Sequence, residues 1–214
     1  MLRKETVEQY TTRLASGEPI PGGGSASALV AALGMALGSM VANLTVAKAQ
    51  GEAAGALKGI LQEAKALQSR LLELVDADAH VFAGVARVFK MPRETEEDKA
   101  ARRKAMQEAL KEAAVVPMEV ARLSVKSLRL QEKLLALGTP HAISDVGVGA
   151  LFLGAALRGA YLNVRINLNG IKDEDYNTGL EKELIPLLEE GVNLAEGILR
   201  QVERKLDPKK GAGE

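Results

Sequence analysis

The chain has 214 residues, and its 28 basic and 28 acidic side chains give a formal net charge of zero. A neutral chain lacks the basic surface that holds a nucleic-acid backbone or an anionic membrane, so we expect no nucleic acid and no membrane among its partners. Cysteine is absent, which excludes disulfide bonds and thiolate metal sites. The polar N-terminus lacks the apolar core of a signal peptide, and we expect a cytoplasmic protein.

Helices are predicted along nearly the whole chain, because alanine and leucine dominate and only 3% of residues are aromatic. No segment shows the sustained alternation of a strand. In chain order the expected helices cover residues 6–15, 25–50, 52–90, 95–137, 140–168 and 173–206. The predicted fold class is all-α, a single-domain bundle of long antiparallel helices over residues 1–206, followed by a flexible tail at 207–214.

Several helix boundaries carry recognisable signals. Ser25 follows three glycines and is the expected N-cap of the second helix. Thr95 and Asp98 have the spacing of a capping box at the start of the fourth helix, in which Pro117 should cause a kink or a break. Thr139, which precedes a proline, is the expected cap of the fifth helix.

The segment PGGGSASALVAALGMALGSMVANLTVAK, residues 21–48, allows three interpretations. Its uncharged part is long enough to span a membrane, but the transfer of alanine, glycine and serine into hydrocarbon releases little free energy. A phosphate-binding loop would need a Gly-Lys-Ser/Thr sequence or a preceding strand, and neither is present. A buried helix is favoured, because Gly34, Gly38 and Ala42 let another helix approach one face closely. The glycines offer backbone N–H groups to an anionic group, although a simple turn and cap explains them as well.

A carboxylate interrupts the apolar face of the third helix. Asp78 stands where a leucine would be expected, and its burial would raise its pKa toward the range of a proton-transfer group. The alternative is an aspartate at a packing edge that reaches water or an arginine. Asp76 falls on another face and is expected to be solvated. The apolar positions of this face are Ala64, Leu67, Leu71, Leu74, Phe82 and Val85.

The fifth helix has a face of small and polar residues. Such a face suits either a polar crevice, in which two amides read the donors and acceptors of a heterocycle, or close helix contact through glycine and alanine. The residues of this face are Asp145, Gly149, Phe152, Ala156, Gly159, Asn163 and Asn167.

Other polar residues give weaker signals. Asn43 and Lys48 come near the end of the second helix, where Lys48 either binds a carboxylate or caps the last carbonyl groups. His80 and His141 each lie one helical turn from an aspartate. Two such pairs on separate helices are weak evidence for a metal, and no metal site is predicted.

Three segments together resemble one known family. PGGGSASALVAALGMALGSMVANLT, LVDADAHVF and ISDVGVGALFLGAALRGAYLNVRINL occur in the order found in the cyclodeaminase and cyclohydrolase family of folate enzymes. The resemblance implies a cyclodeaminase-like helical homodimer that acts on tetrahydrofolate derivatives without a metal or prosthetic group. It implies that Asp78 is catalytic and that Asn163 borders the crevice together with the glycine turn, Gly22, Gly23, Gly24 and Ser25.

The same resemblance assigns weaker roles elsewhere. Lys48 matches the first of two basic residues in relatives, but the second is Ala49 here, which leaves binding of the anionic folate tail at that position in question. The helix patterns, and not the resemblance, add Asn43 and Asn167 to the predicted substrate-binding set. Asp145 completes the set and would either orient Asp78 or contact the pterin. His80 stands where relatives often carry an acid and receives no role.

The resemblance leads to a first expectation and two alternatives. The first is conversion of 5-formiminotetrahydrofolate to 5,10-methenyltetrahydrofolate and ammonia, with Asp78 taking the N10 proton and giving it to the leaving amine. The second is hydrolysis of 5,10-methenyltetrahydrofolate to 10-formyltetrahydrofolate, which has similar proton demands. The third is a helical dimer that binds folate without turnover.

Overall fold

A computed structural model describes residues 1–207 of the chain, and residues 208–214 of the expected flexible tail lie outside this range. The described residues form helices and no strand, which confirms the all-α prediction. The elements are η1 Leu2–Lys4, α1 Val7–Leu14, α2 Gly23–Val46, α3 Gly51–Phe89, α4 Glu96–Leu137, η2 Pro140–Ala142, α5 Ile143–Leu168 and α6 Glu174–Leu206.

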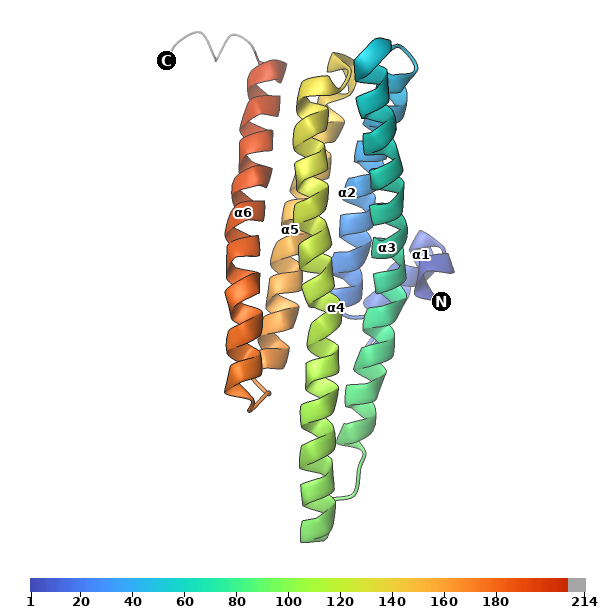
Figure 1. Ribbon diagram of the computed structural model, residues 1–214. Helices are drawn as coiled ribbons and strands as arrows, with labels where there is room; N and C mark the ends of the chain where they lie inside the picture. Colours follow the sequence, from blue (N-terminus) through green and yellow to red (C-terminus); the bar gives the residue numbers. More distant parts are fainter. Residues whose placement is uncertain (208–214) are drawn as a thin grey trace.

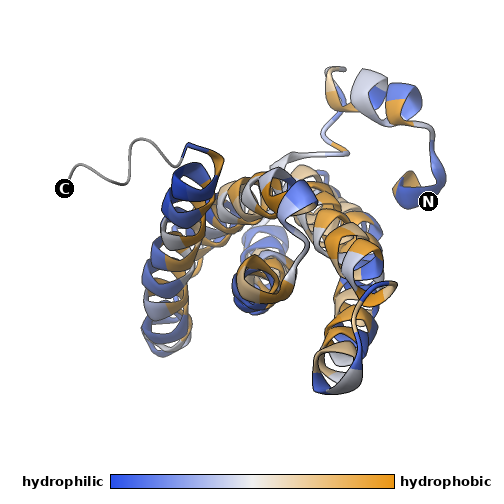
Figure 2. Cartoon of the chain, turned by 90° about the horizontal axis from the view of Figure 1, so that it is seen from above, coloured by the Kyte–Doolittle hydropathy of each residue, from blue (hydrophilic) through white to orange (hydrophobic). Residues whose placement is uncertain are grey.

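The long helices run side by side, and the α3–α4 hairpin extends beyond the ends of α5 and α6 (Figure 1). Helix α4 lies inside an arc formed by α6, α5, α2 and α3, and it packs against all of them (Figure 2). The core lies between this arc and α4 and consists largely of leucine, valine and alanine. Helix α1 lies apart, on the outer side of the arc.

Small residues let α2, α4 and α5 approach one another closely. A Cβ atom at Gly34 would lie 2.9 Å from the carbonyl oxygen of Gly149, and one at Gly149 would lie 2.2 Å from Nε2 of Gln131. The buried Gln131 side chain of α4 donates a 2.9 Å hydrogen bond to the carbonyl oxygen of Gly34. The glycine face of the second helix therefore serves helix contact, as predicted.

Several predicted boundaries are confirmed and others are wrong. The capping box of Thr95 and Asp98 is present. Ser25 is not an N-cap, because Gly22 already accepts the first helical hydrogen bond, from Ala26. Pro117 does not break α4, since it is buried against neighbouring helices whose packing offsets the lost hydrogen bond.

The helix ends also differ from expectation. Helix α2 ends at Val46, a few residues before the predicted end. Thr139 makes no side-chain cap, and a short 3₁₀-helix precedes α5. Such end shifts are small and leave the order and direction of the long helices as predicted.

The outer face of α2 and α5 is apolar and uncovered in the single chain. Both helices are long and apolar enough to cross a membrane by length and composition, but only 44% and 50% of their most apolar windows are buried in the bundle. Large apolar side chains along this face are between 37% and 66% exposed: Leu33, Met40 and Leu44 on α2, and Val148, Leu151, Phe152, Leu162 and Ile166 on α5.

The glycine contact between α2 and α5 predicts a stability change. Replacing Gly34 by valine forces its side chain into the backbone of α5, and we expect a loss of about 1–3 kcal/mol of unfolding free energy. Gly59→Ala is a matched control, because Gly59 lies in α3 with open space around it and should gain about 0.5–1 kcal/mol from helix propensity. Urea unfolding at one protein concentration measures both, and equal stability of the Gly34 variant and the wild type would contradict the close contact.

Candidate functional site

The Asp78 carboxylate of α3 reaches the first turn of α2. The backbone N–H of Ser25 donates a 2.8 Å hydrogen bond to Asp78 Oδ2. A Cβ atom at Gly24 would lie 2.0 Å from Asp78 Oδ1, so only glycine lets the carboxylate come this close. The positive end of the α2 dipole favours a negative group here. The glycine turn of the sequence thus holds an anionic side chain of the chain itself.

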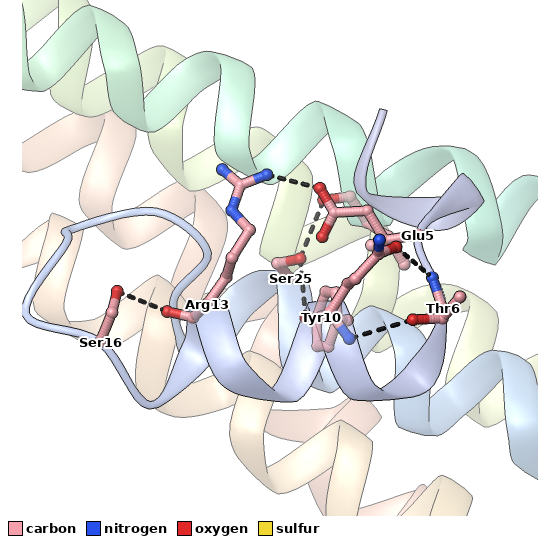
Figure 3. Close-up of polar contacts among 8 residues, drawn as sticks. Glu5, Thr6, Tyr10, Arg13, Ser16 and Ser25 are labelled. Atoms are coloured by element: carbon pink, nitrogen blue, oxygen red, sulfur yellow. Dashed lines mark hydrogen bonds and ion pairs between the residues drawn. The ribbon is translucent and has the colours of Figure 1, made fainter.

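Ser25 locks this arrangement in place through its side chain. Its hydroxyl is fully buried and donates a 3.0 Å hydrogen bond to the carbonyl oxygen of Val75. The Tyr10 hydroxyl of α1 lies 3.0 Å from Ser25 Oγ and acts as the donor, because the Ser25 proton is already given to Val75 (Figure 3). Ser25 is therefore a positioning residue and is not exposed as a nucleophile.

Asp78 opens onto a cavity of about 240 Å³ beside the start of α2. Asp78 is the one ionisable residue among the described residues that line the cavity, so no lining cation neutralises its charge. The walls are mostly apolar and come from the turn before α2 and from α3, α4 and α5. They consist of Pro19, Ile20, Gly22, Gly23, Gly24, Asp78, Ala79, Val81, Phe82, Ala113, Pro117, Asn163, Ile166 and Asn167.

Two amides from α5 also line the cavity. Asn163 Nδ2 donates to the carbonyl oxygen of Gly159 at 2.8 Å. Asn167 Nδ2 donates to the carbonyl oxygens of Asn163, at 2.8 Å, and of Ala113, at 3.3 Å. These bonds engage the amide nitrogens and leave both side-chain oxygens without a partner among residues 1–207. The two oxygens are thus available as acceptors for a bound heterocycle.

Burial changes the pKa values of two groups at the site, Asp78 and Tyr10. It raises the pKa of the Asp78 carboxyl above its usual value, and the hydrogen bond from the Ser25 amide offsets this only in part. Burial also raises the pKa of Tyr10. The hydrogen bond with Ser25 lowers it, while the nearby charges of Asp78 and Glu5 raise it further. A carboxyl with a raised pKa in a mostly apolar cavity is suited to proton transfer.

Comparison with known proteins identifies the family. Residues 6–185 match the family model described as Formiminotransferase-cyclodeaminase. The chain belongs to this family. The resemblance seen in its three sequence motifs is confirmed.

Two of the three relatives compared with this cyclodeaminase-family chain are named for enzymes that act on a tetrahydrofolate derivative. Methenyltetrahydrofolate cyclohydrolase of Methylorubrum extorquens is 38% identical over 208 residues, which are 97% of this chain and 100% of that protein. Formimidoyltransferase-cyclodeaminase of Sus scrofa is 32% identical over 95% of this chain, which spans only 38% of that protein. The crystal structure of formiminotetrahydrofolate cyclodeaminase from Thermotoga maritima has a TM-score of 0.80 at 28% identity, and covers 98% of this chain and 100% of that one. The chain is an enzyme of the folate cyclodeaminase and cyclohydrolase family.

The predicted site residues of this family member fall into two groups. Asp78, the glycine turn, Asn163 and Asn167 meet at the cavity, or directly behind it in the case of Ser25. Asn43, Lys48 and Asp145 do not line it. They lie at the opposite end of α2 and α5, and Asn43 is about 28 Å from Gly24 along the helix. Within one chain these three cannot contact a group held by Asp78.

The histidines give no metal site in the described structure. His80 and His141 are both exposed. Among residues 1–207 no group of three or more histidine, cysteine, aspartate or glutamate side chains is arranged to hold a metal ion. Asp76, the neighbour of His80 on α3, instead forms an ion pair with Arg3.

The sequence interpretation missed several contributors to the site, including Tyr10, Ala113, Pro117 and Ile166. Tyr10 forms a hydrogen bond with Ser25, but in the sequence it stands out only as an aromatic residue in a short polar helix. Ala113 and Pro117 form the α4 wall, and their place depends on how α4 crosses α3 and α5. No local pattern could have identified them, because the three helices are distant in sequence.

The raised pKa of Asp78 predicts a pH-dependent change in stability. The folded chain holds the Asp78 proton more tightly than the unfolded chain, so the ionised carboxyl costs stability above the folded-state pKa. We expect Asp78→Asn to be more stable than the wild type near neutral pH, and the difference to shrink as the pH falls through that raised pKa. Urea unfolding over a pH series measures this, with Asp76→Asn as the control. A stability difference that does not change with pH would refute the assignment.

Proposed function

We propose that the chain is a methenyltetrahydrofolate cyclohydrolase, which converts 5,10-methenyltetrahydrofolate and water to 10-formyltetrahydrofolate. The observation that carries this proposal is a single, partly buried carboxylate in a cavity whose described lining holds no cation. The methenyl bridge carries a positive charge shared between N5 and N10, which such a carboxylate complements. The relative from Methylorubrum extorquens, which matches over its whole length, bears the name of this activity.

Asp78 performs the proton transfers in this mechanism. Its ionised carboxyl takes one proton from a water molecule as the oxygen attacks the bridging carbon. The protonated carboxyl then gives this proton to N5 as the bond between N5 and the carbon breaks. The remaining hydroxyl proton leaves to solvent as the formyl C=O forms, so one proton is released for each cation hydrolysed. A raised pKa suits both the uptake and the return of the proton.

The rest of the cavity orients the substrate. Asn163 and Asn167 present their amide oxygens to the N–H groups of the pterin. Phe82 and Ile166 supply an apolar surface for the rings. The Ser25 amide holds one carboxylate oxygen of Asp78 and leaves Oδ1 for the water molecule. This mechanism needs no prosthetic group.

The cyclodeaminase reaction is the second candidate, although the sequence motifs alone placed it first. The full-length Thermotoga maritima relative bears that name. In this reaction N10 attacks the carbon of the protonated formimino group, Asp78 takes the N10 proton, and the carbon–nitrogen bond to the amine breaks as Asp78 protonates it to ammonia. Both reactions place a cationic amidine-like carbon beside the same carboxylate. The relative named for the cyclohydrolase is more similar in sequence, so we rank hydrolysis first.

Replacing Asp78 tests the enzymatic proposal. We expect Asp78→Asn to lower the rate of methenyl hydrolysis by roughly two or more orders of magnitude, because the proton transfers and the charge that complements the methenyl bridge are both lost, while the amides and apolar walls still bind the pterin. Asp76→Asn should retain wild-type turnover. The wild-type rate should fall as the pH drops below the raised pKa of Asp78, since the base must be ionised.

Activity assays of the purified wild-type protein with each substrate in turn distinguish between the candidate functions. Loss of the methenyl absorbance with formation of the 10-formyl product supports the cyclohydrolase. Ammonia release from 5-formiminotetrahydrofolate without methenyl hydrolysis would reverse the ranking. Binding without turnover of either compound would support the remaining alternative, a folate-binding dimer without catalysis.

We further propose that the chain forms a homodimer through the apolar face of α2 and α5. Monomeric proteins rarely expose a contiguous apolar face of this kind. A charge on this face should oppose association, so we expect Leu162→Glu to shift the protein toward the monomer in light scattering at micromolar concentration. Val115→Glu is the matched control, because Val115 is similarly exposed but lies on α4. A monomeric wild type would contradict the proposal.

A further inference from the structure

Helix α4 passes through a proline that lines the cavity. Pro117 is buried inside α4, which runs without a break from Glu96 to Leu137. A proline has no N–H, and its ring clashes with the carbonyl group four residues earlier, so Pro117 cannot make the helical hydrogen bond to the carbonyl oxygen of Ala113. Ala113 is only 5% exposed and also lines the cavity. Its carbonyl group is therefore costly to leave without another donor.

The side chain of Asn167 on α5 supplies this donor. Asn167 Nδ2 donates to the carbonyl oxygen of Ala113 at 3.3 Å and to the carbonyl oxygen of Asn163 at 2.8 Å. Carbonyl oxygens only accept hydrogen bonds, so the amide must turn its NH2 group toward these two atoms. Both N–H bonds of the Asn167 amide are then used, and its oxygen is the atom left for a ligand in the cavity.

The neighbouring amide is held less completely. Asn163 Nδ2 donates to the carbonyl oxygen of Gly159 at 2.8 Å, within the same helix. It forms no second hydrogen bond among residues 1–207. Asn167 is thus the cavity amide whose orientation is set from two helices, by one contact inside α5 and one contact across to α4.

A second proline inside a helix shows the effect of the same substitution on the surface. Pro186 lies in α6 and is exposed, and the carbonyl group four residues earlier belongs to Lys182, which is also exposed. Water can pair with this carbonyl group. Neither residue lines the cavity. Both helices lose one hydrogen bond, but in α4 the freed carbonyl group is buried and pairs with a cavity side chain.

We infer that Pro117 is a positioning residue: it leaves the carbonyl oxygen of Ala113 free of its helical partner, and this oxygen holds the Asn167 amide with its own oxygen toward a bound pterin. The inference deepens the proposed function and rests on it for the identity of the ligand. The proline thereby determines which hydrogen-bonding group the α5 wall offers to the substrate.

The orientation matters because an amide can present either a donor or an acceptor. With a helical N–H on the carbonyl oxygen of Ala113, the Asn167 amide would lose one of the two contacts that fix it. A rotated amide would present its NH2 group to the N–H groups of the pterin, and two facing donors leave both groups unpaired. The orientation seen in the structure selects a ligand edge that carries N–H donors.

Pro117→Ala tests the inference, because it restores the missing helical donor. We expect KM for 5,10-methenyltetrahydrofolate to rise roughly three- to tenfold, as for the loss of one neutral hydrogen bond. The value of kcat should stay within about twofold of the wild type, since the amide binds the pterin equally in the ground state and the transition state. Pro186→Ala is the matched control, and it should leave both constants unchanged. An unchanged KM in Pro117→Ala would overturn the inference.

A double variant separates positioning from packing. Asn167→Ala removes the amide and should raise KM at least as much as Pro117→Ala. If Pro117 acts through Asn167, adding Pro117→Ala to Asn167→Ala should cause no further rise. Increases that multiply in the double variant would show that Pro117 affects the cavity by another route, and the inference would then be wrong.

NMR hydrogen exchange tests the contact without relying on activity. The side-chain signals of Asn167 are assigned by their loss in Asn167→Ala. One of its two N–H groups should exchange with solvent faster in Pro117→Ala than in the wild type, and Pro186→Ala should match the wild type. Equal exchange in all three proteins would overturn the inference. If the wild type turns over neither folate, the proposed function fails, and this measurement still decides whether Pro117 orients the Asn167 amide.

Discussion

The approach of the Asp78 carboxylate to the first turn of α2 is the constraint on which the site depends. It needs a glycine at position 24, where any Cβ atom would occupy the place of Oδ1, and an N–H at Ser25 that points at Oδ2. It also needs α2 to be held in register with α3, which Ser25 achieves through the carbonyl oxygen of Val75 and the hydroxyl of Tyr10. The backbone at the start of α2 thereby stabilises the Asp78 carboxylate, whose burial would otherwise be unfavourable.

This constraint also shapes the chemistry. Burial raises the pKa of Asp78, while the Ser25 amide and the α2 dipole limit the increase, so the carboxyl can both accept and return a proton. The cavity supplies no second charged residue among its described lining, and in the proposed reactions the positive charge of the substrate would provide the complement. The same features suit both proposed reactions, hydrolysis of a methenyl bridge and cyclisation with loss of ammonia. This explains how one family contains relatives named for both reactions.

Helices α2 and α5 are apolar on two sides, one inside the bundle and one on its outer surface. Gly34, Gly149 and Gln131 bring α2, α4 and α5 together on the inner side of the arc. The outer side of α2 and α5 is as apolar as a core, yet the single chain leaves it uncovered. A helix with apolar residues on both sides is expected where a second copy continues the packing. The proposed dimer would bury this outer face of α2 and α5.

The sequence by itself determined the helices, their order, the glycine contact and the unusual position of Asp78, because helical periodicity and small-residue spacing are local properties of the chain. Family motifs added the folate chemistry. Only the tertiary structure decided that Ser25 holds the start of α2 through its side chain instead of capping it, that Tyr10, Ala113 and Pro117 belong to the site, and that the cavity forms away from Asn43, Lys48 and Asp145. These features depend on contacts between helices distant in the sequence, and the register of such contacts is set by packing, which no local pattern encodes.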